Sequence, residues 1–391
     1  MRHHPNHGNK YSKMPRSPAK HLCHDMHSSL YVSWGPRGWE ASPCCLYLSD
    51  ARTHIGEKIR EEHWFHSLWP ELRRDNLADG PLDPALCGHC VNDECVGKQS
   101  RRRGELIRRG PSLVTPVVGP RYLEVAMDMT CNSACMICGN ERSSFWKRYS
   151  DRPRDLTRAS QGDIDQLLEN LDLSQLDHMN IAGGEPLLTD RHITLLRTLE
   201  RRGVDLGKIQ LRYNTNGTCR VDDEVLELWS KFRQVILYFS LDDTGEAFNY
   251  QRFPGDWNTV TENMWWFRDH LSPNVLMRVE RTVSLLNAHR LKFLDRWVRD
   301  DFPFNGFDQR VEVQTHMAEG VLGIENISGR HLESIKADPE AHALLSKMYP
   351  VGDMRHTDRD NARVLNLVDT QDQRRGMAIG SYFPEFRSYY I

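Results

Sequence analysis

The sequence predicts an α/β protein: a partial (β/α)6 barrel of parallel strands, preceded by a small cysteine-rich module and followed by a helical extension. Three observations support this fold class. Short β-rich runs alternate with helix-length segments from about residue 120, nine of the ten cysteines lie in the first 138 residues, and a helical pattern lies at 329–348. With 391 residues, the chain is long enough for one large core and a small accessory domain.

Four parts are expected along the chain, and the first is a basic flexible tail. Residues 1–20 contain five Lys or Arg residues and no acidic residue, but they lack the apolar run of about 7 to 15 residues that a secretory signal needs. No segment reaches the roughly 18 apolar residues of a membrane span. The sequence therefore indicates a soluble, cytoplasmic protein without a membrane partner, and its net charge of -3 gives no reason to expect nucleic acid. The other parts are the cysteine-rich module (21–118), the barrel (119–320) and the C-terminal helical extension (321–391).

Six β-rich runs in the barrel segment are each separated from the next by a helix-length segment. Such alternation implies parallel strands joined by right-handed crossovers, and six units fall short of the eight that close a barrel. Arg201, Arg202 and Gly203 form a stop signal for the second helix, since basic side chains and a following glycine favour a helix C-terminus. The predicted strands lie within 121–129, 178–183, 208–217, 234–243, 275–284 and 310–317, and the helices within 165–172, 193–203, 223–232, 260–271 and 291–302.

The segment after the first barrel strand carries Cys131, Cys135 and Cys138 at the spacing C-x3-C-x2-C. Active sites of parallel α/β folds lie beyond the carboxyl ends of the strands, which is where this loop falls. Three thiolates can hold three irons of a four-iron cluster and leave the fourth iron open to a ligand. The alternatives are a zinc site, which needs four ligands although the nearest histidine is His178, and structural cysteines with or without a disulfide.

Short motifs follow the next three strands at the same expected edge of the sheet, namely GGEP, NTNGT and SLDD. Gly183 and Gly184 allow backbone groups to approach a ligand closely. Glu185 supplies a carboxylate that can accept from an ammonium group, and Pro186 can fix the turn. Each motif taken alone also fits an ordinary turn, as Asn216 followed by a glycine illustrates.

Taken together, the four motifs in this order after consecutive strands resemble the radical S-adenosylmethionine (radical SAM) superfamily. The resemblance implies a [4Fe-4S] cluster on Cys131, Cys135 and Cys138, with the open iron chelated by the amino and carboxylate groups of S-adenosylmethionine. Ile137 stands where the superfamily usually has an aromatic residue, so packing on the adenine would be aliphatic. The resemblance places the methionyl amine at Gly183, Gly184, Glu185 and Pro186, and the ribose and carboxylate at Asn214, Asn216, Ser240 and Asp242.

The resemblance also implies an activity. A radical SAM enzyme cleaves S-adenosylmethionine reductively to a 5'-deoxyadenosyl radical, which abstracts a hydrogen atom from a substrate. Oxidative, epimerising or bond-forming modification of a peptide is the first expectation, and the same chemistry on a sugar, amino acid or natural-product intermediate is the alternative. The implied electron donor is a protein such as flavodoxin or ferredoxin. An alternative of another class is a zinc-binding interaction module without catalysis.

The cysteines before the barrel form a second group. Residues 24–45 fit two short extended pieces about a Gly-Pro turn that end on a thiol pair. Four of these cysteines, Cys23, Cys44, Cys87 and Cys90, would together give a four-thiolate site for zinc or for a closed iron–sulfur cluster. The segments resemble the twitch module, a half-length relative of the SPASM domain that carries one auxiliary four-iron cluster but commonly follows the barrel; a zinc knuckle and free thiols are the alternatives. The resemblance rests on Cys87, Cys90, Glu94, Gly97, Ser100 and Arg102, with Cys45 and Cys95 left spare.

Further candidates lie outside these motifs. Residues 101–110, RRRGELIRRG, either contact phosphate or an acidic leader peptide, or form a solvated helix that links the module to the barrel. Cys219 either returns a hydrogen atom to a substrate radical near the barrel mouth or is a buried structural thiol. Alternation places Arg278 and Glu280 on one face of the fifth strand and Arg281 on the other. Arg278 and Glu280 are expected to pair there and to contact cofactor or substrate, since an unpaired charge on a central strand is costly.

The C-terminal extension shows one helical pattern, at 329–348. Asp369, Arg375 and the FPEF motif also resemble the ends of twitch radical proteins. We expect the extension to form a strap across the base or the mouth of the barrel. The tryptophans, including Trp265 and Trp266, are expected in the core and at packing interfaces.

Overall fold

A computed structural model describes residues 22–47, 53–62, 64–77, 82–95, 100–109, 118–150, 157–303, 310–318, 320–348 and 361–391. The predicted basic tail and Gly97 lie outside these residues. Contacts divide the chain into two compact units: the first lies within 1–128, 157–182 and 193–211, and the second within 129–156, 183–192 and 212–391. Because this division cuts through the barrel segment, the predicted domain boundaries stay a prediction.

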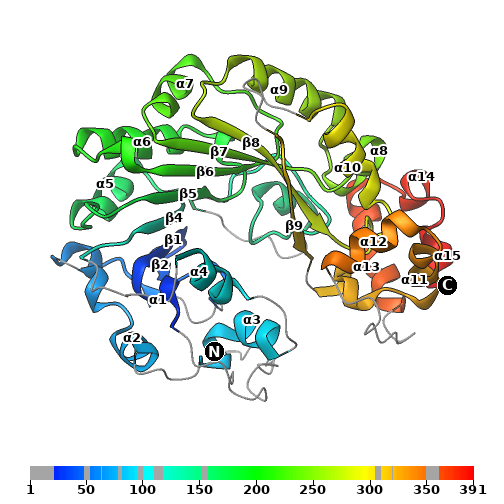
Figure 1. The fold of residues 1–391 in the computed structure, drawn as a ribbon, viewed down its shortest axis with the longest axis horizontal. Helices are drawn as coiled ribbons and strands as arrows, with labels where there is room; N and C mark the ends of the chain where they lie inside the picture. The colour runs from blue at the N-terminus through cyan, green and yellow to red at the C-terminus, as the bar shows by residue number, and fades with distance from the viewer. Residues whose placement is uncertain are drawn as a thin grey trace. The chain divides into compact units, whose positions relative to one another are not determined.

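The six barrel strands that the sequence predicts are all present. Among the described residues the sheet has the strand order β3-β2-β1-β4-β5-β6-β7-β8-β9 (Figure 1). The pairs β4·β5, β7·β8 and β8·β9 are parallel, which confirms the expectation from the alternating pattern. The barrel strands are β4 (Tyr122–Ala126), β5 (His178–Ala182), β6 (Gln210–Thr215), β7 (Gln234–Ser240), β8 (Val275–Val283) and β9 (Val313–Met317).

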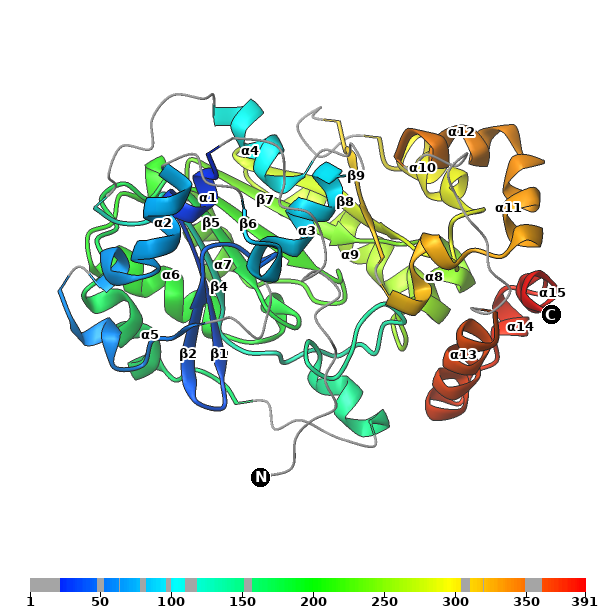
Figure 2. The same cartoon turned by 90° about the horizontal axis from the view of Figure 1, so that it is seen from below.

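The cysteine-rich segment contributes the remaining strands. β1 (Ser29–Gly35) and β2 (Gly38–Ser42) form an antiparallel hairpin about Pro36 and Arg37, which confirms the two predicted extended pieces (Figure 2). Gly38 adopts a φ of 95°, a left-handed conformation that favours glycine at this turn. β1 pairs in parallel with β4, and β2 pairs with the short β3 (Thr53–His54). The N-terminal segment therefore extends the barrel sheet instead of standing apart from it.

The helices Gln161–Glu169 and Asp223–Ser230, which follow barrel strands, begin at side-chain caps. Ser160 and Asp163 form a reciprocal capping box, and Asp222 accepts from the backbone N–H of Val225 at 3.1 Å. Gly203, with a φ of 70°, follows the second predicted helix and confirms its stop signal. The short helix α8 was not predicted. The helices are α5 (Gln161–Glu169), α6 (Arg191–Arg201), α7 (Asp223–Ser230), α8 (Gly245–Gln251), α9 (Trp257–His270) and α10 (Leu291–Asp300).

The C-terminal extension is helical, as predicted, but its first pattern is broken. Residues 329–348 form two helices and not one, because Pro339 lacks a backbone N–H donor and therefore begins a new helix. Figures 1 and 2 show these helices gathered beside α8 and α10, in agreement with the packing of α12 on α10 and of α14 on α8. The helices are α11 (Gly329–Lys336), α12 (Pro339–Met348), α13 (Asn361–Arg375), α14 (Ile379–Tyr382) and α15 (Phe386–Tyr390).

The remaining helices belong mostly to the cysteine-rich segment. Helix α1 packs against α2 and α4. These helices are α1 (His24–Ser28), α2 (Pro70–Leu77), α3 (Pro84–Cys95) and α4 (Arg101–Arg109). Short 3-10 helices lie at Lys58–Arg60, Trp64–Ser67, Ser144–Tyr149, Pro186–Leu188, Leu206–Lys208, Gly320–Leu322 and Ile324–Asn326.

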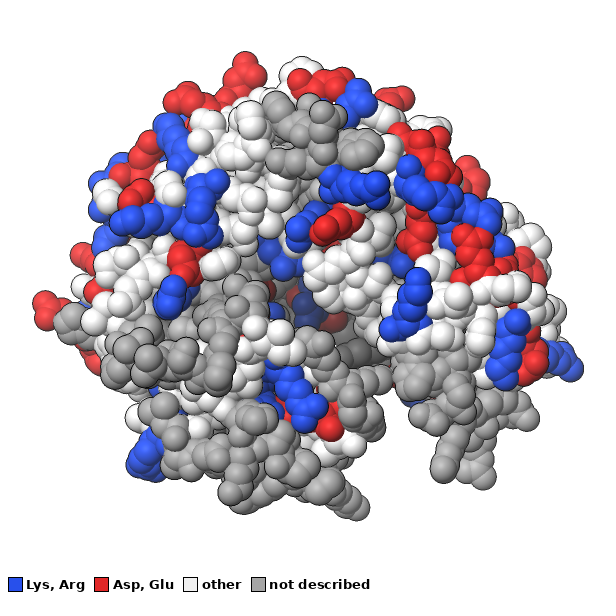
Figure 3. Space-filling view, in the orientation of Figure 1, with Lys and Arg blue, Asp and Glu red and all other residues white. Residues whose placement is uncertain are grey.

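Charges of both signs are mixed on the surface of the second unit. Figure 3 shows basic and acidic side chains interspersed over the region of α9 and α10. Arg296 pairs there with Glu340, and Lys292 pairs with Asp338. On the described residues of this face, such mixing differs from the extended basic stripe that tracks nucleic-acid phosphates. None of the described helices is long and apolar enough to cross a membrane.

Candidate active site

The loop that follows β4 carries the three clustered cysteines, and its backbone is fixed from two directions. Ser144 lies at the start of the 3-10 helix Ser144–Tyr149; its hydroxyl accepts from the backbone N–H of Cys131 at 3.0 Å. From the other direction, the backbone N–H of Ala134 donates to the carbonyl of Phe253 at 2.6 Å, just beyond α8. The conformation of the loop thus depends on both neighbouring segments.

The thiols of Cys131, Cys135 and Cys138 are electrostatic neighbours. Burial, together with the charge of a neighbouring thiolate, raises the pKa of Cys131 to about 12. Burial likewise raises the pKa of Cys135 to about 12, although the positive charge of Arg252 opposes the shift. Burial also raises the pKa of Cys138 to about 11. Among the described residues, no three His, Cys, Asp or Glu side chains are arranged to ligate one metal ion. The donor set itself fits the implied cluster, because three thiols lie on one fixed loop.

The GGEP loop after β5 packs directly on the cysteine loop. A Cβ atom at Gly184 would lie 2.2 Å from the carbonyl oxygen of Thr130, so only glycine fits at this position. Gly183 adopts a φ of 142°, and the next backbone N–H, that of Glu185, donates to the same Thr130 oxygen at 2.7 Å. Pro186, buried, begins the 3-10 helix that follows. The two glycines therefore bring the second loop against the first.

The carboxylate of Glu185 joins the second loop to the third. Its Oε1 atom accepts from the hydroxyl of Thr215 at 2.8 Å and from the backbone N–H of Leu187 at 3.1 Å. Its Oε2 atom accepts from the backbone N–H of Asn216 at 2.6 Å. Burial, at 2% exposure, raises the pKa of Glu185 to about 7 despite these donors. In this arrangement the carboxylate binds protein groups, whereas the sequence suggested an ammonium as its partner.

The third loop, NTNGT, returns to the cysteine loop through Asn216. The side-chain amide of Asn216 donates to Asn132 at 2.8 Å and to Ser133 at 3.2 Å. Asn132 in turn donates to the hydroxyl of Thr218 at 2.8 Å. Cys219, next along the chain, is half-buried; burial raises its pKa, and its sulfur lies 3.7 Å from the Thr218 hydroxyl. The third loop therefore holds two residues of the cysteine loop in place.

The fourth loop, SLDD, binds Arg252, whose chain neighbours Gln251 and Phe253 accept backbone hydrogen bonds from the cysteine loop. The Nε atom of Arg252 donates to Asp242 at 2.8 Å, and the backbone N–H of Thr282 donates to the other carboxylate oxygen at 2.9 Å. Asp243 pairs with Arg290 at 2.7 Å, although burial raises the pKa of Asp243 to about 6. Ser240 is partly buried at the end of β7.

Polar side chains line the face of β6 and β8 opposite the helices. Asn214 and Arg212 both donate to Glu280, the latter at 3.2 Å, and His316 of β9 lies 2.8 Å from the same carboxylate. Burial acts to raise the pKa of Glu280, but the hydrogen bond and charge of His316, together with Arg212, outweigh it and lower the pKa. Arg278 shares this face with Glu280, as predicted from alternation.

The predicted ion pair between Arg278 and Glu280 is wrong. Arg278 instead pairs with Glu312 at 3.2 Å and donates to Tyr238 at 3.2 Å, while neighbouring strands supply the partners of Glu280. Side chains two apart on one strand point the same way, so partners on adjacent strands lie closer. Arg281 does lie on the opposite face, where it pairs with Asp295 of α10 at 2.9 Å.

In the first unit, four cysteines line one cavity. They are the four that the sequence grouped: Cys23, Cys44, Cys87 and Cys90. Cys95 is exposed. Burial raises the pKa of Cys23, Cys44, Cys87 and Cys90, and neighbouring thiolates and acidic groups raise it further.

The structure brings together three members of the twitch-like motif, namely Glu94, Ser100 and Arg102. Ser100 donates to Glu94 at 2.5 Å, and Arg102 forms a two-point ion pair with the same carboxylate, both side chains being fully buried. Arg101 also lines the cavity and donates to Asp25 at 2.6 Å. The interpretation of 101–110 as a solvated helix is therefore wrong for Arg101 and Arg102, which face the cysteines.

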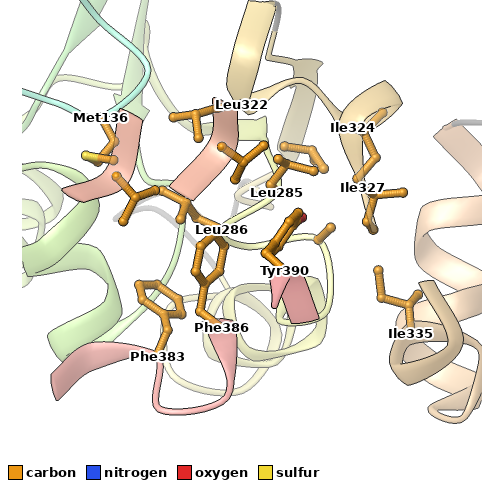
Figure 4. Packing of buried hydrophobic residues seen from close by; sticks show 14 of the residues in the cluster. Met136, Leu285, Leu286, Leu322, Ile324, Ile327, Ile335, Phe383, Phe386 and Tyr390 are labelled. Carbon is orange, nitrogen blue, oxygen red and sulfur yellow. The ribbon is translucent and has the colours of Figure 1, made fainter. Parts of the chain in front are cut away.

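Several supporting residues lie outside the four loop motifs, and among them Arg375 is the one that the sequence had already singled out. Tyr250 of α8 donates to Asp372 of α13 at 2.8 Å, and Arg375 donates to the carbonyl of Tyr250 at 2.9 Å. Met136, between two of the clustered cysteines, packs in an apolar cluster with Phe383 and other residues of the C-terminal extension (Figure 4). The extension thus supports the cysteine loop; these partners become visible only when α8 and α13 are folded.

Comparisons with known proteins give one family match. Residues 129–279 match the Radical SAM superfamily. No curated protein matches the chain.

Several solved structures are similar at low identity. A structure described as native anSMEcpe with bound AdoMet is 18% identical over 65% of this chain and 62% of that chain, with a TM-score of 0.38. Streptococcus suis SuiB bound to S-adenosylmethionine is 12% identical over 86% of this chain and 72% of that chain, with a TM-score of 0.39. SuiB bound to precursor peptide SuiA is 12% identical over 93% and 74%, with a TM-score of 0.37. This chain thus spans less than two thirds of the anSMEcpe structure. Because all three TM-scores are below 0.5, these similarities support no conclusion about the function of this chain.

The matched segment contains the cysteine loop, the three loops tied to it, and the strands β5, β6 and β7. Strand β4, which precedes the cysteine loop, lies outside the match. The match to the Radical SAM superfamily therefore covers residues 129–279, the segment that carries the cysteine loop and the three loops tied to it.

Proposed function

We propose that this enzyme cleaves S-adenosylmethionine reductively at the loop of Cys131, Cys135 and Cys138, and that the 5'-deoxyadenosyl radical abstracts a hydrogen atom from a peptide. The main support for the proposal is the hydrogen-bond network that connects the four loops. Glu185 binds the third loop, and Asn216 binds the cysteine loop. Asp242 of the fourth loop binds Arg252, and the carbonyls on either side of Arg252 in the chain accept from the cysteine loop. Such mutual support holds a cofactor in a fixed position relative to the thiols.

The residues of the site have distinct roles in this proposal. Cys131, Cys135 and Cys138 would hold three irons of a [4Fe-4S] cluster, which supplies the electron for cleavage when it is reduced by a donor such as flavodoxin or ferredoxin. Backbone groups at Gly183 and Gly184 would approach the methionyl amine, since neither residue has a side chain in the way. Glu185 and Pro186 would fix that loop rather than touch the amine.

The side chains expected to contact the ribose and carboxylate differ in their exposure and in whether protein groups already bind them. Asn214 and Ser240 are partly exposed on the polar face, and Asn214 is bonded to Glu280. Asn216 and Asp242 are buried and bonded to protein groups, so they would position the loops. Cys219 is half-buried beside the third loop, which is compatible with either of its two interpretations.

A polar substrate fits the face of β6, β8 and β9. Arg212, Arg278, Glu280 and His316 project from it and offer both charges and hydrogen-bond donors. A peptide can use such groups along its backbone and side chains, and we therefore retain it as the first substrate class. A sugar, amino acid or natural-product intermediate is the second class. The match of residues 129–279 to the Radical SAM superfamily favours this radical chemistry over the alternative of a non-catalytic zinc module.

The four-cysteine cavity of the first unit would hold an auxiliary [4Fe-4S] cluster. Four thiols around one cavity provide the full ligand set of a closed cluster, and they would equally suit zinc. An auxiliary cluster would give an oxidative reaction an acceptor for the substrate's electron.

Protein purified and reconstituted without oxygen tests both metal sites. We expect about eight irons per chain, falling to about four in a Cys131, Cys135 and Cys138 triple Ala variant, with loss of 5'-deoxyadenosine release under dithionite. Cys95→Ala is the matched control, because this exposed cysteine belongs to neither set; it should keep all the iron. About four irons falling to none would assign the first-unit cysteines to zinc or to free thiols. No deoxyadenosine from wild type would contradict the proposed cleavage.

The substrate class needs a separate experiment. A short peptide encoded beside the gene, deuterated at its carbon positions, would be incubated with S-adenosylmethionine and dithionite. Deuterium in the released 5'-deoxyadenosine, together with a mass change in the peptide, would support the peptide proposal. Turnover of a deuterated small molecule, with an inert peptide, would support the second class.

A further inference from the structure

The four-cysteine cavity contains a buried ion pair beside its thiols. Asp25, only 3% exposed, lines the cavity, and its Oδ1 atom accepts from the hydroxyl of Ser29 at 2.9 Å. Its Oδ2 atom accepts from Nε of Arg101 at 2.6 Å. The Asp25 carboxylate therefore has a fixed place among four sulfur atoms, and its charge acts on several of them.

The two arginines that line the cavity, Arg101 and Arg102, pair with different carboxylates. Arg102 is fully buried and is matched by Glu94, which also accepts from Ser100. Arg101 keeps 26% of its side chain exposed and pairs with Asp25. Removing Arg101 would thus leave the Asp25 carboxylate uncompensated at the cavity, whereas the neighbouring pair of Arg102 and Glu94 would stay neutral.

A negative charge beside the thiols opposes the uptake of an electron. One-electron reduction adds a negative charge to a cluster held by four thiolates and breaks no bond. Asp25 disfavours that added charge by Coulomb repulsion, and Arg101 favours it by attraction. Because both groups are largely shielded from water, solvent screens them weakly.

We propose that Arg101 and Asp25 together set the reduction potential of the auxiliary cluster, with Arg101 favouring the reduced form and Asp25 the oxidised form. This inference rests on the auxiliary cluster of the proposed function. It assigns both residues a role in tuning the cluster, and neither would ligate iron. A near-balanced pair would keep the cluster able to accept an electron from a substrate radical and to pass it on.

The test uses the full chain with the barrel cysteines Cys131, Cys135 and Cys138 replaced by alanine, so that only the first-unit cluster is observed. Potentiometric titration followed by EPR would compare this parent with Arg101→Gln, Asp25→Asn and the double variant. We expect Arg101→Gln to shift the reduction equilibrium about tenfold toward the oxidised form, which is 59 mV for one electron. Asp25→Asn should shift it by a similar factor in the opposite direction, and the double variant should return close to the parent.

Two controls separate charge from structure. Arg101→Lys keeps the positive charge and should stay within about threefold of the parent. Arg103→Gln, on the same helix but 38% exposed and 4.0 Å from Glu94, should leave the equilibrium unchanged. Iron content is measured for each variant and should stay at about four per chain.

The outcomes distinguish this inference from the proposal on which it rests. A parent without iron would overturn the auxiliary cluster itself. A parent with iron whose potential is unaffected by Arg101→Gln and Asp25→Asn would overturn only the tuning role. Shifts of the same sign in both variants, or a shift in Arg101→Lys equal to that in Arg101→Gln, would also overturn it. Loss of iron in Arg101→Gln or Asp25→Asn would also overturn the tuning role, because it would show that the replaced residue is needed for cluster assembly.

Discussion

The two cysteine sites of this protein are built in opposite ways. The barrel site draws its three thiols from one short loop, and backbone hydrogen bonds to neighbouring loops hold that loop. The first-unit site draws four thiols from three separate segments, and buried ion pairs surround them. The difference indicates that a contiguous ligand set needs backbone support, whereas a dispersed set depends on charge balance between elements that fold together.

The largest expected effect is at the ion pair of the first-unit site. Arg102→Met would remove the two-point ion pair of the fully buried Glu94 carboxylate, which would keep the Ser100 hydroxyl and the longer 4.0 Å contact with Arg103. We expect the free energy of unfolding to fall by about 3–5 kcal/mol. Urea unfolding followed by circular dichroism, with iron content measured alongside, would check this prediction.

Arg103→Met is the matched control on the same helix. Its side chain is 38% exposed, so the expected change is below about 1 kcal/mol. Replacing both members, Arg102→Met with Glu94→Gln, should recover part of the loss, since no charge is then left unpaired. A loss for Arg102→Met no larger than the control's would show that charge balance does not hold this site together.

The second effect is a pH dependence at the barrel site. Burial raises the pKa of Glu185 to about 7, above its unfolded value of 4.5. Between these values the folded state binds more protons than the unfolded state, so stability falls as pH rises from about 4.5 to 7 and is constant above. The expected fall is on the order of 3 kcal/mol, measured by urea unfolding at several pH values.

Glu185→Gln provides the comparison, because the amide does not titrate. The variant should lose this pH dependence, while also losing one accepting oxygen. If wild type and variant showed parallel pH profiles in this window, another group would be responsible, and the buried carboxylate would not be the link between the loops.

The third effect concerns backbone contact. Gly184→Ala would place a Cβ atom 2.2 Å from the carbonyl oxygen of Thr130, so that the GGEP loop must move off the cysteine loop. We expect a loss of about 1–3 kcal/mol and a selective loss of barrel iron, with the first-unit iron retained. Iron analysis and deoxyadenosine release would measure this. Gly380→Ala, where a Cβ atom meets nothing within 4 Å, should change neither; equal iron loss from both sites would contradict the separate support of the two sites.

The difference between the sites also explains what the sequence could predict. The strands were found because β-rich runs are local, and the barrel thiols because their spacing is local. The grouping of Cys23, Cys44, Cys87 and Cys90 required an assumption about the fold, and the structure places all four around one cavity. Arg101 and Arg102 look like a solvated run until the buried partners Asp25 and Glu94 are placed against them.

The local sequence pattern could not predict which side chains form hydrogen bonds and ion pairs with one another. Alternation placed Arg278 and Glu280 on one face, but their partners come from strands far along the chain, such as His316 on β9. The position of Arg252 depends on α8, a short helix without a periodic apolar pattern that would have revealed it. The role of Tyr250 depends on α13, more than a hundred residues later.

The smallest expected effect tests that last contact and, through it, the support of the barrel site by the C-terminal extension. Tyr250→Phe removes the hydrogen bond from the phenol to Asp372 but keeps the ring, which packs against Tyr382 and Phe383. We expect a loss of about 1–2 kcal/mol, measured by thermal unfolding, because a buried carboxylate oxygen loses one donor. The other oxygen of Asp372 still accepts from the backbone N–H of Ile379, so the helices should stay in place.

Tyr250→Phe also tests whether the C-terminal extension supports the cysteine loop specifically or only stabilises the protein as a whole. Arg375 donates to the backbone carbonyl of Tyr250, and the next carbonyl, that of Gln251, accepts from Met136 between the clustered cysteines. If the extension holds the cysteine loop through this path, Tyr250→Phe should slow deoxyadenosine release more than Tyr389→Phe, which removes a hydroxyl contact with Ser334 in the same extension. Equal effects of the two variants would confine the role of α13 to stability and leave the barrel site supported by its loops alone.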